Sequence, residues 1–209
     1  MSFFKKFRTL FKHQTIKIYS FNTDFRTPQS ISTNKKRNLD HIKTATLHDI
    51  EELHQRSEMK LGYHDFKSLL KKIEENTWHC VISKTDGQIT GYGFFSTVEM
   101  NFHLSKKISF ILPPSTGYFF NLFVHPDFRN RSLGKYLTAA IMEIIQEMGY
   151  QITLTAVDKN NKVQIRNVQK MGGEFLGSIV LLKVRSFYKI MISKKLKKVN
   201  IEFNGIFDY

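Results

Sequence analysis

The sequence predicts an α/β fold built on a mixed β-sheet, because strand and helix patterns alternate through the middle of the chain. Residues 119–124 form a nearly continuous apolar run, which is typical of a buried central strand. From Leu133 to Met148 the apolar residues recur at helical spacing, and Gly149 is placed as the C-cap of that helix. A second strand pattern follows at residues 152–157, so we expect the two strands to lie parallel in one sheet. The central sheet is expected to hold about six to seven strands and to be flanked by about four helices.

Further elements are expected on both sides of this central region. Thr46 is a suitable N-cap for a helix that extends to about Met59. Asp86-Gly87 is a tight-hairpin signal between two strand patterns. Residues 99–116 are expected to form an irregular insertion. The remaining expected elements are a strand at 41–45, a helix at 63–75, strands at 78–83 and 89–97, a helix at 162–171, and strands at 175–182 and 187–192.

The two ends of the chain differ in composition from the region between them. Residues 1–38 are expected to form an N-terminal segment, residues 39–195 one domain, and residues 196–209 a C-terminal tail. In the first segment, a basic amphipathic helix is expected at residues 1–12, followed by a short strand and a linker. One face of this helix is nearly all aromatic, so it is expected to pack on its own domain, on a second subunit of a homodimer, or on an anionic membrane.

The chain is strongly basic, and this charge indicates an anionic partner. Its 209 residues include 32 Lys and Arg against 18 Asp and Glu, which gives a formal net charge of +14. Nucleic acid, an anionic lipid surface and a phosphorylated ligand would each suit this charge. The sequence holds no recognisable base-reading motif, which makes nucleic acid the weakest of the three expectations.

Other features restrict the class of protein. Cys80 is the only cysteine, so an intramolecular disulfide and a zinc site built from cysteine pairs are excluded, and we expect no metal. No apolar run approaches the roughly 20 residues that span a bilayer, and the N-terminus lacks the apolar core of a signal peptide. We therefore expect the protein in the cytoplasm, either free or held peripherally at the inner face of a membrane.

The segment from Arg129 to Lys135 lies between the buried strand and the amphipathic helix. Small residues at Ser132 and Gly134 let the backbone approach a ligand closely, and the first N–H groups of the helix point toward that ligand. Together with the helix dipole these donors favour a phosphate or a pyrophosphate, and Arg129 and Arg131 add charge. The strand, the turn and the helix together predict a phosphate-binding site.

This segment resembles the signature of the GNAT superfamily of acetyl-CoA-dependent N-acetyltransferases. That signature is Arg/Gln-x-x-Gly-x-Gly/Ala after a strand that ends in a Val-His-Pro-like turn, and residues 124–134 follow it with Ser132 in place of the first glycine. The resemblance continues at Asn161 and from Ile165 to Gly173. It implies a GNAT-like fold, acetyl-CoA as the co-substrate and an amine as the acceptor.

The resemblance also implies which residues bind the cofactor. The main chain near Leu122–Val124 would contact the thioester arm, the turn after it would hold the pyrophosphate, and Asn161 would contact the arm. The positions carried over in this way are Leu122, Phe123, Val124, Arg129, Asn130, Arg131, Ser132, Leu133, Gly134, Lys135 and Asn161.

The general acid and base are harder to place, because their usual positions lack suitable side chains. Many relatives carry a glutamate on the strand where this chain has Phe119, Phe120 and Asn121, and a tyrosine where it has Val168. A thiol with a pKa near the ordinary value of about 8.5 is a tolerable leaving group without an acid. The substitute candidates are Glu99, His103, His125 and Tyr188, each of which also has a structural interpretation.

Three functions are compatible with these patterns. The favoured one is transfer of an acetyl group from acetyl-CoA to the primary amine of a small molecule, such as an amino sugar, a sugar nucleotide or an amino acid. The second is acetylation of a protein or peptide amine. The third is a non-catalytic module that keeps the GNAT fold and binds membrane or nucleic acid through its basic ends.

Overall fold

The structure, a computed structural model, describes residues 11–22, 42–59, 61, 66–101, 108–184, 187–197 and 202–205. These residues divide into two compact units. The first holds helix α5 (Leu133–Glu147) and the described residues within 22–98 and 115–153, and we call it the α5 unit. The second holds strand β9 (Glu174–Val184) and the described residues within 1–21, 99–114 and 154–209, and we call it the β9 unit.

The sheet of the α5 unit has the strand order β7-β4-β3-β2, and its neighbouring strands are antiparallel. The strands are β2 (Ile42–Thr44), β3 (Trp78–Thr85), β4 (Gln88–Ser96) and β7 (Thr116–Val124). Asp86 and Gly87 join β3 to β4 with positive φ angles of 51° and 78°, as a tight hairpin turn requires. The hairpin predicted at this position is confirmed.

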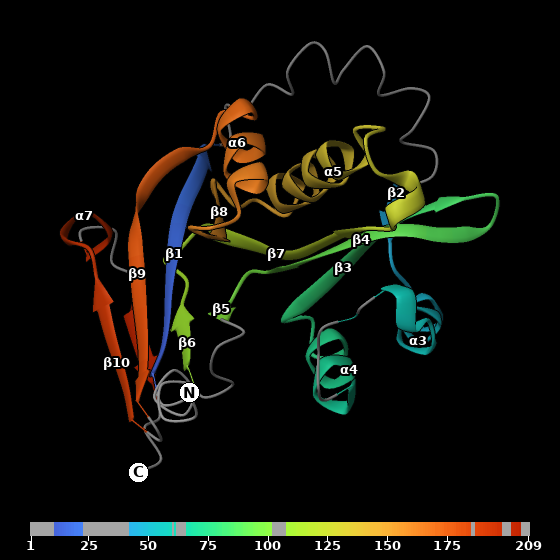
Figure 1. Cartoon of the computed structure of the whole chain (residues 1–209). Coiled ribbons are helices and arrows are strands. Elements are labelled where there is room, and N and C mark those ends of the chain that lie inside the picture. Colours follow the sequence, from blue (N-terminus) through green and yellow to red (C-terminus); the bar gives the residue numbers. More distant parts are fainter. Residues whose placement is uncertain are drawn as a thin grey trace, which may run out of the picture. The chain divides into compact units, whose positions relative to one another are not determined.

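Helix α5 packs along one face of these strands, and glycines in the sheet make room for it (Figure 1). Leu137, Ile141 and Ile145 recur at four-residue spacing on the helix and are fully buried, as the helical pattern predicts. A Cβ atom placed on Gly91 would lie 2.9 Å from Leu137, and one on Gly93 would lie 2.7 Å from Ile141. These distances are too short for real contacts, so glycine at both positions lets the helix approach the sheet.

Helices α3 (Leu47–Gln55) and α4 (Phe66–Glu74) lie on the other face of these strands (Figure 1). Helix α3 begins at the predicted cap, because Oγ1 of Thr46 accepts the Asp49 N–H at 3.2 Å and Oδ2 of Asp49 accepts the Thr46 N–H at 2.9 Å. The helix is shorter than predicted. It ends at Gln55, and a separate 3₁₀ turn, η2 (Ser57–Met59), follows.

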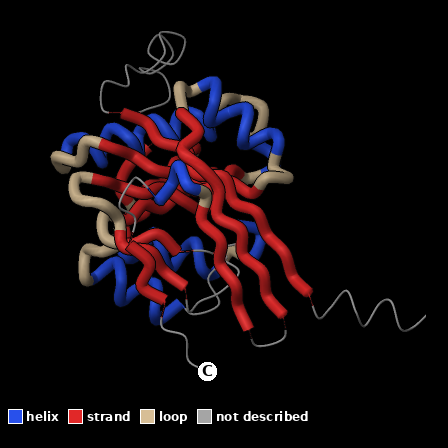
Figure 2. Tube along the Cα trace, turned by 90° about the vertical axis from the view of Figure 1, so that its left-hand side faces the viewer, coloured by secondary structure: helices blue, strands red, loops and turns tan. Residues whose placement is uncertain are grey.

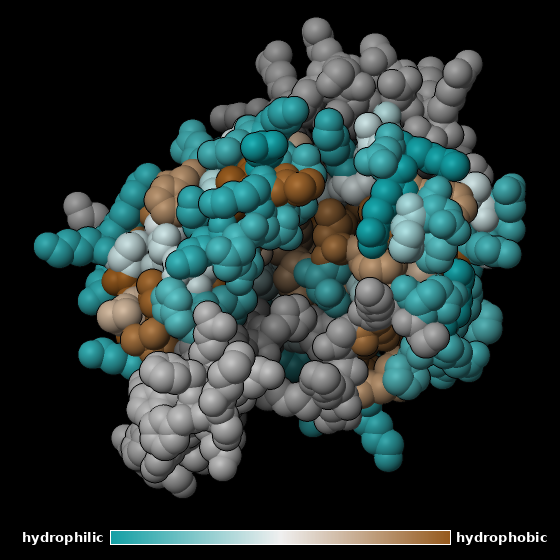
Figure 3. Space-filling view, viewed as in Figure 1, coloured by the Kyte–Doolittle hydropathy of each residue, from teal (hydrophilic) through white to brown (hydrophobic). Residues whose placement is uncertain are grey.

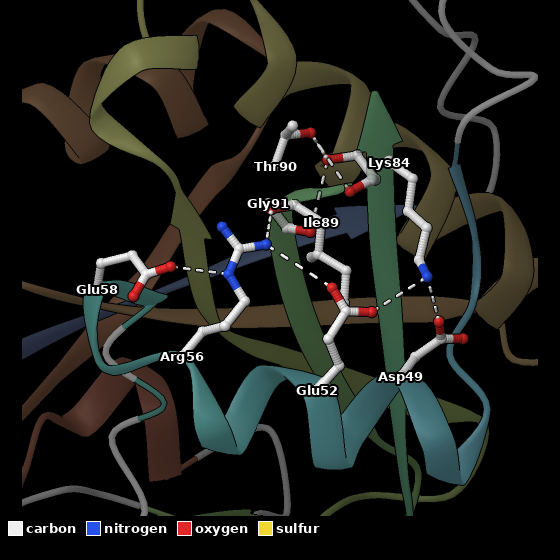
Figure 4. Close-up of polar contacts among 9 residues, drawn as sticks. Asp49, Glu52, Arg56, Glu58, Lys84, Ile89, Thr90 and Gly91 are labelled. Carbon is white, nitrogen blue, oxygen red and sulfur yellow. Dashed lines mark hydrogen bonds and ion pairs between the residues drawn. The ribbon is translucent and has the colours of Figure 1, made fainter. Parts of the chain in front are cut away.

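A chain of ion pairs attaches α3 to β3 and β4 (Figure 4). Nζ of Lys84, on β3, lies 2.7 Å from Oδ1 of Asp49 and 3.3 Å from Oε2 of Glu52. Nη1 of Arg56, at the end of α3, donates to the Ile89 carbonyl of β4 at 3.1 Å and lies 3.7 Å from Glu52. Helix α3 is therefore held to the sheet by charged groups along its length as well as by its apolar side.

Aromatic rings cover the face of the sheet that is turned away from α5. Tyr92 and Phe94 flank Gly93 on β4, so their side chains point to the opposite face from that glycine. The Phe94 and Phe120 rings are 6.0 Å apart, and the Tyr118 and Phe120 rings are 5.2 Å apart. All four of these aromatic residues are buried, which makes the layer a second core of the α5 unit.

The main sheet of the β9 unit has the strand order β10-β9-β1-β8. Its other strands are β1 (Phe11–Asn22), most of β8 (Ile152–Asp158) and β10 (Phe187–Ile192), and Figure 2 shows the long strands side by side as red tubes. Strand β9 is antiparallel to both β1 and β10. Helices α6 (Lys162–Lys170) and α7 (Lys194–Lys197) belong to the same unit. The two runs of strands total eight, more than the six to seven predicted, because β1 takes part.

A second sheet in the β9 unit corrects the prediction of an irregular insertion. Strands β5 (Glu99–Asn101), β6 (Ile108–Ile111) and β11 (Glu202–Gly205) have the order β11-β6-β5, and both pairings are antiparallel. The prediction was wrong because β6 pairs with residues far along the chain, which no local pattern shows. Strand β11 lies within the segment predicted as a tail.

The predicted N-terminal helix falls mostly outside the described residues. Phe11 and Lys12, its last two residues, belong to β1, which also begins earlier than the strand predicted at residues 16–21. Residues 1–10 lie outside the described part, and the domain boundaries expected near residues 39 and 195 stay predictions. The α/β fold itself is confirmed by the described strands and helices.

The described surface is mainly polar in the face shown in Figure 3, where hydrophobic residues appear in separate places. Among the described helices, none is long and apolar enough to cross a membrane.

Candidate functional site

The turn between β7 and α5 contains two residues in the left-handed region. His125 follows the strand, a 3₁₀ turn η3 (Pro126–Phe128) comes next, and Asn130 and Ser132 then have φ angles of 62° and 61°. A serine in this region is strained, because its Cβ atom crowds the backbone, and asparagine tolerates it better. Backbone strain of this kind persists only where the surrounding structure enforces it, and it is found most often at active and ligand-binding sites. The turn is therefore a candidate site.

The N-terminus of α5 is open to a ligand. Ser132 occupies the N-cap position, but its side chain makes no capping hydrogen bond. Its carbonyl accepts the N–H groups of Lys135 at 2.9 Å and Tyr136 at 3.2 Å, whereas the N–H groups of Leu133 and Gly134 have no partner within the helix. A Cβ atom placed on Gly134 would have no neighbour closer than 3.7 Å. Backbone donors and the positive end of the helix dipole therefore meet at this point.

The two arginines of the turn rest against aromatic rings. Nε of Arg129 donates to the Val124 carbonyl at 3.1 Å, and its guanidinium lies 5.9 Å from the centre of the Phe123 ring. The Arg131 guanidinium lies 5.3 Å from the centre of the Phe128 ring. Both arginines are exposed, so the turn carries two positive charges whose positions are restricted by stacking.

Strand β7 is interrupted by a bulge just before this turn. Phe123 pairs with Tyr92 and Phe120 pairs with Phe94, so Asn121 and Leu122 together lie opposite the single residue Gly93. Asn121 has a φ angle of 51°, which places it in the left-handed region within a strand. Bulges of this kind re-aim side chains and interrupt pairing, and they gather near active sites. The bulge precedes the Leu122–Val124 segment predicted to contact the cofactor.

Comparison with known proteins decides the family. The profile of the acetyltransferase (GNAT) family matches residues 44–173, which is more than half of the chain and includes the turn, the bulge and α5. This chain belongs to the GNAT acetyltransferase family. Comparison with curated proteins yields no significant match.

Solved structures agree with a GNAT acetyltransferase fold. The aminoglycoside N-acetyltransferase AAC(6')-Iy is 19% identical, with 64% of this chain and 89% of that chain covered at a TM-score of 0.51. A GNAT-family protein from Novosphingobium aromaticivorans is 12% identical, with 82% and 64% covered at 0.56. The glucosamine N-acetyltransferase region of a fungal multi-domain beta-N-acetylglucosaminidase is 12% identical, with 87% and 22% covered at 0.60. This chain therefore spans much less than the full length of the last of these proteins, and the likeness to all three shows the fold.

As a GNAT acetyltransferase, the protein is an acetyl-CoA-dependent N-acetyltransferase. The turn has features that suit the pyrophosphate of that substrate: the first N–H groups of α5 are uncapped, a Cβ atom on Gly134 would have no close neighbour, and two exposed arginines lie in the same turn. Within the described residues, no group of three or more His, Cys, Asp or Glu side chains could hold a metal ion.

The four candidate acid and base residues lie in different places. Glu99 begins β5 and Tyr188 lies in β10, so both belong to the β9 unit. His103 lies outside the described residues. His125 directly follows β7 in the α5 unit. Their roles stay predictions.

The geometry of His125 suits a structural role better than a general base. Its Nδ1 accepts the Asp127 N–H at 3.4 Å, and its backbone N–H donates to the Thr90 carbonyl at 2.9 Å. The ring also meets Phe128 edge-on, with 6.0 Å between centres. The same Nδ1 lies 3.7 Å from Oδ2 of Asp127, so the ring is engaged within its own turn.

Two further positions of the family pattern lie in the β9 unit. Oδ1 of Asn161 accepts the Gln164 N–H at 3.0 Å and so caps α6, and its predicted contact with the cofactor arm stays a prediction. Val168, which stands where relatives have a tyrosine, is 2% exposed, and a Cβ atom on Gly173 would meet it at 2.5 Å. Val168 is therefore a core residue of α6.

Proposed function

We propose that the protein transfers the acetyl group of acetyl-CoA to a primary amine of a small molecule that carries a carboxylate or a phosphate. The observation that carries the cofactor half of this proposal is the uncapped N-terminus of α5 behind a turn held in the left-handed region. Arg129–Lys135 would bind the pyrophosphate, and the main chain from Leu122 to Val124 would contact the thioester arm.

The reaction requires little from ionisable side chains. The neutral amine attacks the thioester carbonyl, a C–N bond forms, the C–S bond breaks, and the thiolate of coenzyme A leaves with the electron pair. The proton released by the amine passes to a base. The thiolate is stable enough near neutral pH to leave without an acid, so a valine at position 168 is compatible with turnover.

The net charge of the chain supports this acceptor class. A chain with a net charge of +14 repels polycations and attracts anions at a distance, so it favours acceptors that offset the charge of their amine. Among amino sugars, sugar nucleotides and amino acids, the sugar nucleotides and amino acids meet this condition. The similar folds include proteins named for aminoglycoside and glucosamine acceptors. These amines carry no anionic group, so they serve as comparison acceptors.

A panel of amines tests the proposal. Purified protein is mixed with acetyl-CoA and, in turn, with amino acids, a nucleotide-linked amino sugar, glucosamine, an aminoglycoside and a peptide with a free N-terminus, and the free thiol is measured. We expect the anionic small amines to release the most coenzyme A. Release with the peptide alone would support a protein acetyltransferase instead, and binding of acetyl-CoA without any release would support a non-catalytic module.

We also keep as proposals the cytoplasmic location, a homodimer, and contact of residues 1–12 with the inner face of a membrane. A vesicle-binding test of the last should remove residues 1–10 only, because Phe11 and Lys12 belong to β1.

A further inference from the structure

Asn121 combines two unusual features at one point of β7. Its backbone lies in the left-handed region, with φ at 51°. Its side-chain Nδ2 atom is buried and finds no hydrogen-bond partner among the described residues. Buried donors are nearly always paired, because an unpaired one loses its hydrogen bond to water without replacement. Two such costs at one residue, with no partner among the described residues, point to a bound ligand as the partner.

The described surroundings of Asn121 include two aromatic rings. The Asn121 side chain approaches the hydroxyl of Tyr92 without a well-formed hydrogen bond, and the Tyr92 ring stacks on Phe123 with 5.5 Å between centres. Burial raises the pKa of Tyr92 far above its ordinary value. The nearby Asn121 side chain lowers this pKa by a smaller amount, so Tyr92 stays a neutral phenol. A hydrogen bond made among such groups is stronger than one made in water.

The position of Asn121 along the strand separates it from the phosphate-binding turn. Three residues of extended strand, about 10 Å, lie between Asn121 and the end of β7 at Val124. The Leu122 side chain points toward α5, because a Cβ atom on Gly93 would meet it at 3.0 Å alongside Ile141. The Asn121 residue therefore lies back along β7 from the strand end, at a distance from the phosphate-binding turn.

We propose that Nδ2 of Asn121 donates a hydrogen bond to the carbonyl oxygen of the acetyl thioester and to the oxyanion that develops on it. This inference rests on the proposed function, because it takes the thioester to lie at the bulge. As the amine nitrogen bonds to the carbonyl carbon, the carbonyl electron pair moves to oxygen, and it returns when the C–S bond breaks. Asn121 gains and loses no proton in this step. A fixed amide in a dry site stabilises the developing charge without reorganisation.

Asn121→Gly is the variant that removes the amide and keeps the backbone, because glycine adopts positive φ without strain. Calorimetry then compares the binding of acetyl-CoA with that of free coenzyme A, which lacks the carbonyl. We expect the wild-type protein to prefer acetyl-CoA by about five- to tenfold and the variant to lose this preference, with coenzyme A binding unchanged. In turnover with an accepted amine, kcat should fall by about 100-fold.

A spectroscopic measurement reads the same contact without turnover. The infrared carbonyl stretch of carbonyl-¹³C acetyl-CoA should lie at lower frequency when bound to the wild-type protein than when bound to Asn121→Gly. Asn121→Asp, which keeps the side-chain shape and replaces the amide by an acceptor, should remove the shift as well. Equal affinity ratios and equal carbonyl frequencies in the wild type and both variants would overturn the inference while leaving acetyl-CoA binding and transfer intact. Absence of any coenzyme A binding by the wild-type protein would instead overturn the proposed function, and this inference with it.

Discussion

Helices α3 and α5 both begin against the same sheet, and they begin in opposite ways. Thr46, at the start of α3, is extended, with φ and ψ of −82° and 167°, and closes a reciprocal capping box with Asp49. Ser132, at the start of α5, is left-handed, with φ and ψ of 61° and 7°, and caps nothing. The first helix satisfies its terminal N–H groups with its own residues, and the second leaves them available. Because α3 in the same unit has a complete cap, the uncapped N-terminus of α5 indicates that its free N–H groups bind a ligand.

The electrostatic surroundings of the two helix starts differ in the same sense. Asp49 is 2% exposed and lies 2.7 Å from Nζ of Lys84 and 3.1 Å from Nζ of Lys43. Burial alone would raise the pKa of Asp49, but hydrogen bonds from Lys84 and Thr46 hold it well below its ordinary value. The start of α3 therefore carries its own buried anion, whereas the turn before α5 carries the exposed positive charges of Arg129 and Arg131.

The largest expected effect comes from removing the negative charge of Asp49 at the start of α3. Asp49→Asn removes a buried carboxylate that accepts hydrogen bonds from Lys84, Lys43 and Thr46, while Lys84 keeps its contact with Glu52. We expect the free energy of unfolding to fall by about 3 kcal/mol, because hydrogen bonds to a charged group contribute about 1.5–3 kcal/mol each. Chemical denaturation at pH 7 measures this loss. Lys43→Met is the matched control: Lys43 is 52% exposed, so its loss should change stability by about 0.5 kcal/mol or less. Equal losses of unfolding free energy in the two variants would show that the buried Asp49 carboxylate contributes no more to stability than the exposed Lys43 side chain.

The same variant makes a pH prediction with a definite sign. Because the folded-state pKa of Asp49 lies below its unfolded value of about 3.9, its contribution is complete above that pH. The contribution declines as the pH falls below about 4 and vanishes below the folded pKa. The stability difference between wild type and Asp49→Asn should therefore be constant from pH 5 to 7 and shrink in more acidic buffers. A difference that grows as the pH falls would contradict the assignment.

The open start should be sensitive to added negative charge. Gly134→Glu places a carboxylate at the donors expected to hold pyrophosphate, and we expect affinity for acetyl-CoA to fall by about 100-fold, measured by calorimetry. Gly134→Ala is the control for side-chain bulk, because its Cβ atom would meet Val124 at 3.7 Å and Leu122 at 3.9 Å, which are ordinary contacts. The alanine variant should bind within a few-fold of wild type. Equal weakening in both variants would indicate crowding and would remove the electrostatic interpretation of the open start.

Local patterns in the sequence predicted both helix starts, but from different kinds of residue. Thr46 followed by Asp49 is a cap signal of neighbouring residues, and the structure contains that cap. The small residues and arginines from Arg129 to Gly134 predicted an open turn, and the left-handed φ of Ser132 agrees with the glycine expected there by the family pattern.

Features that depend on distant partners were not found in the sequence. Strand β6 is formed by pairing with β11, nearly a hundred residues away, and β1 by pairing with β9, so neither partner could be read from local periodicity. The bulge at Asn121 depends on the register between β4 and β7. The sequence did contain one signal of the bulge. Asn121 is the one polar residue in the apolar run at 119–124, where a buried strand would be expected to carry an apolar side chain.

The smallest expected effect tests the strain of the open start directly. Ser132→Gly removes the crowding of Cβ at a φ of 61° but makes the unfolded chain more flexible, so we expect a net gain in unfolding free energy of about 0.5 kcal/mol. Affinity for acetyl-CoA should stay within about twofold, because backbone N–H groups rather than the side chain face the phosphate. Ser132→Ala keeps the strain and removes the hydroxyl, so it should leave stability almost unchanged, whereas loss of a true cap costs about 1 kcal/mol. Thermal and denaturant unfolding of both variants measures the difference. If Ser132→Ala loses as much stability as Thr46→Ala, the Ser132 hydroxyl is a cap in solution, and the contrast between the two helix starts disappears.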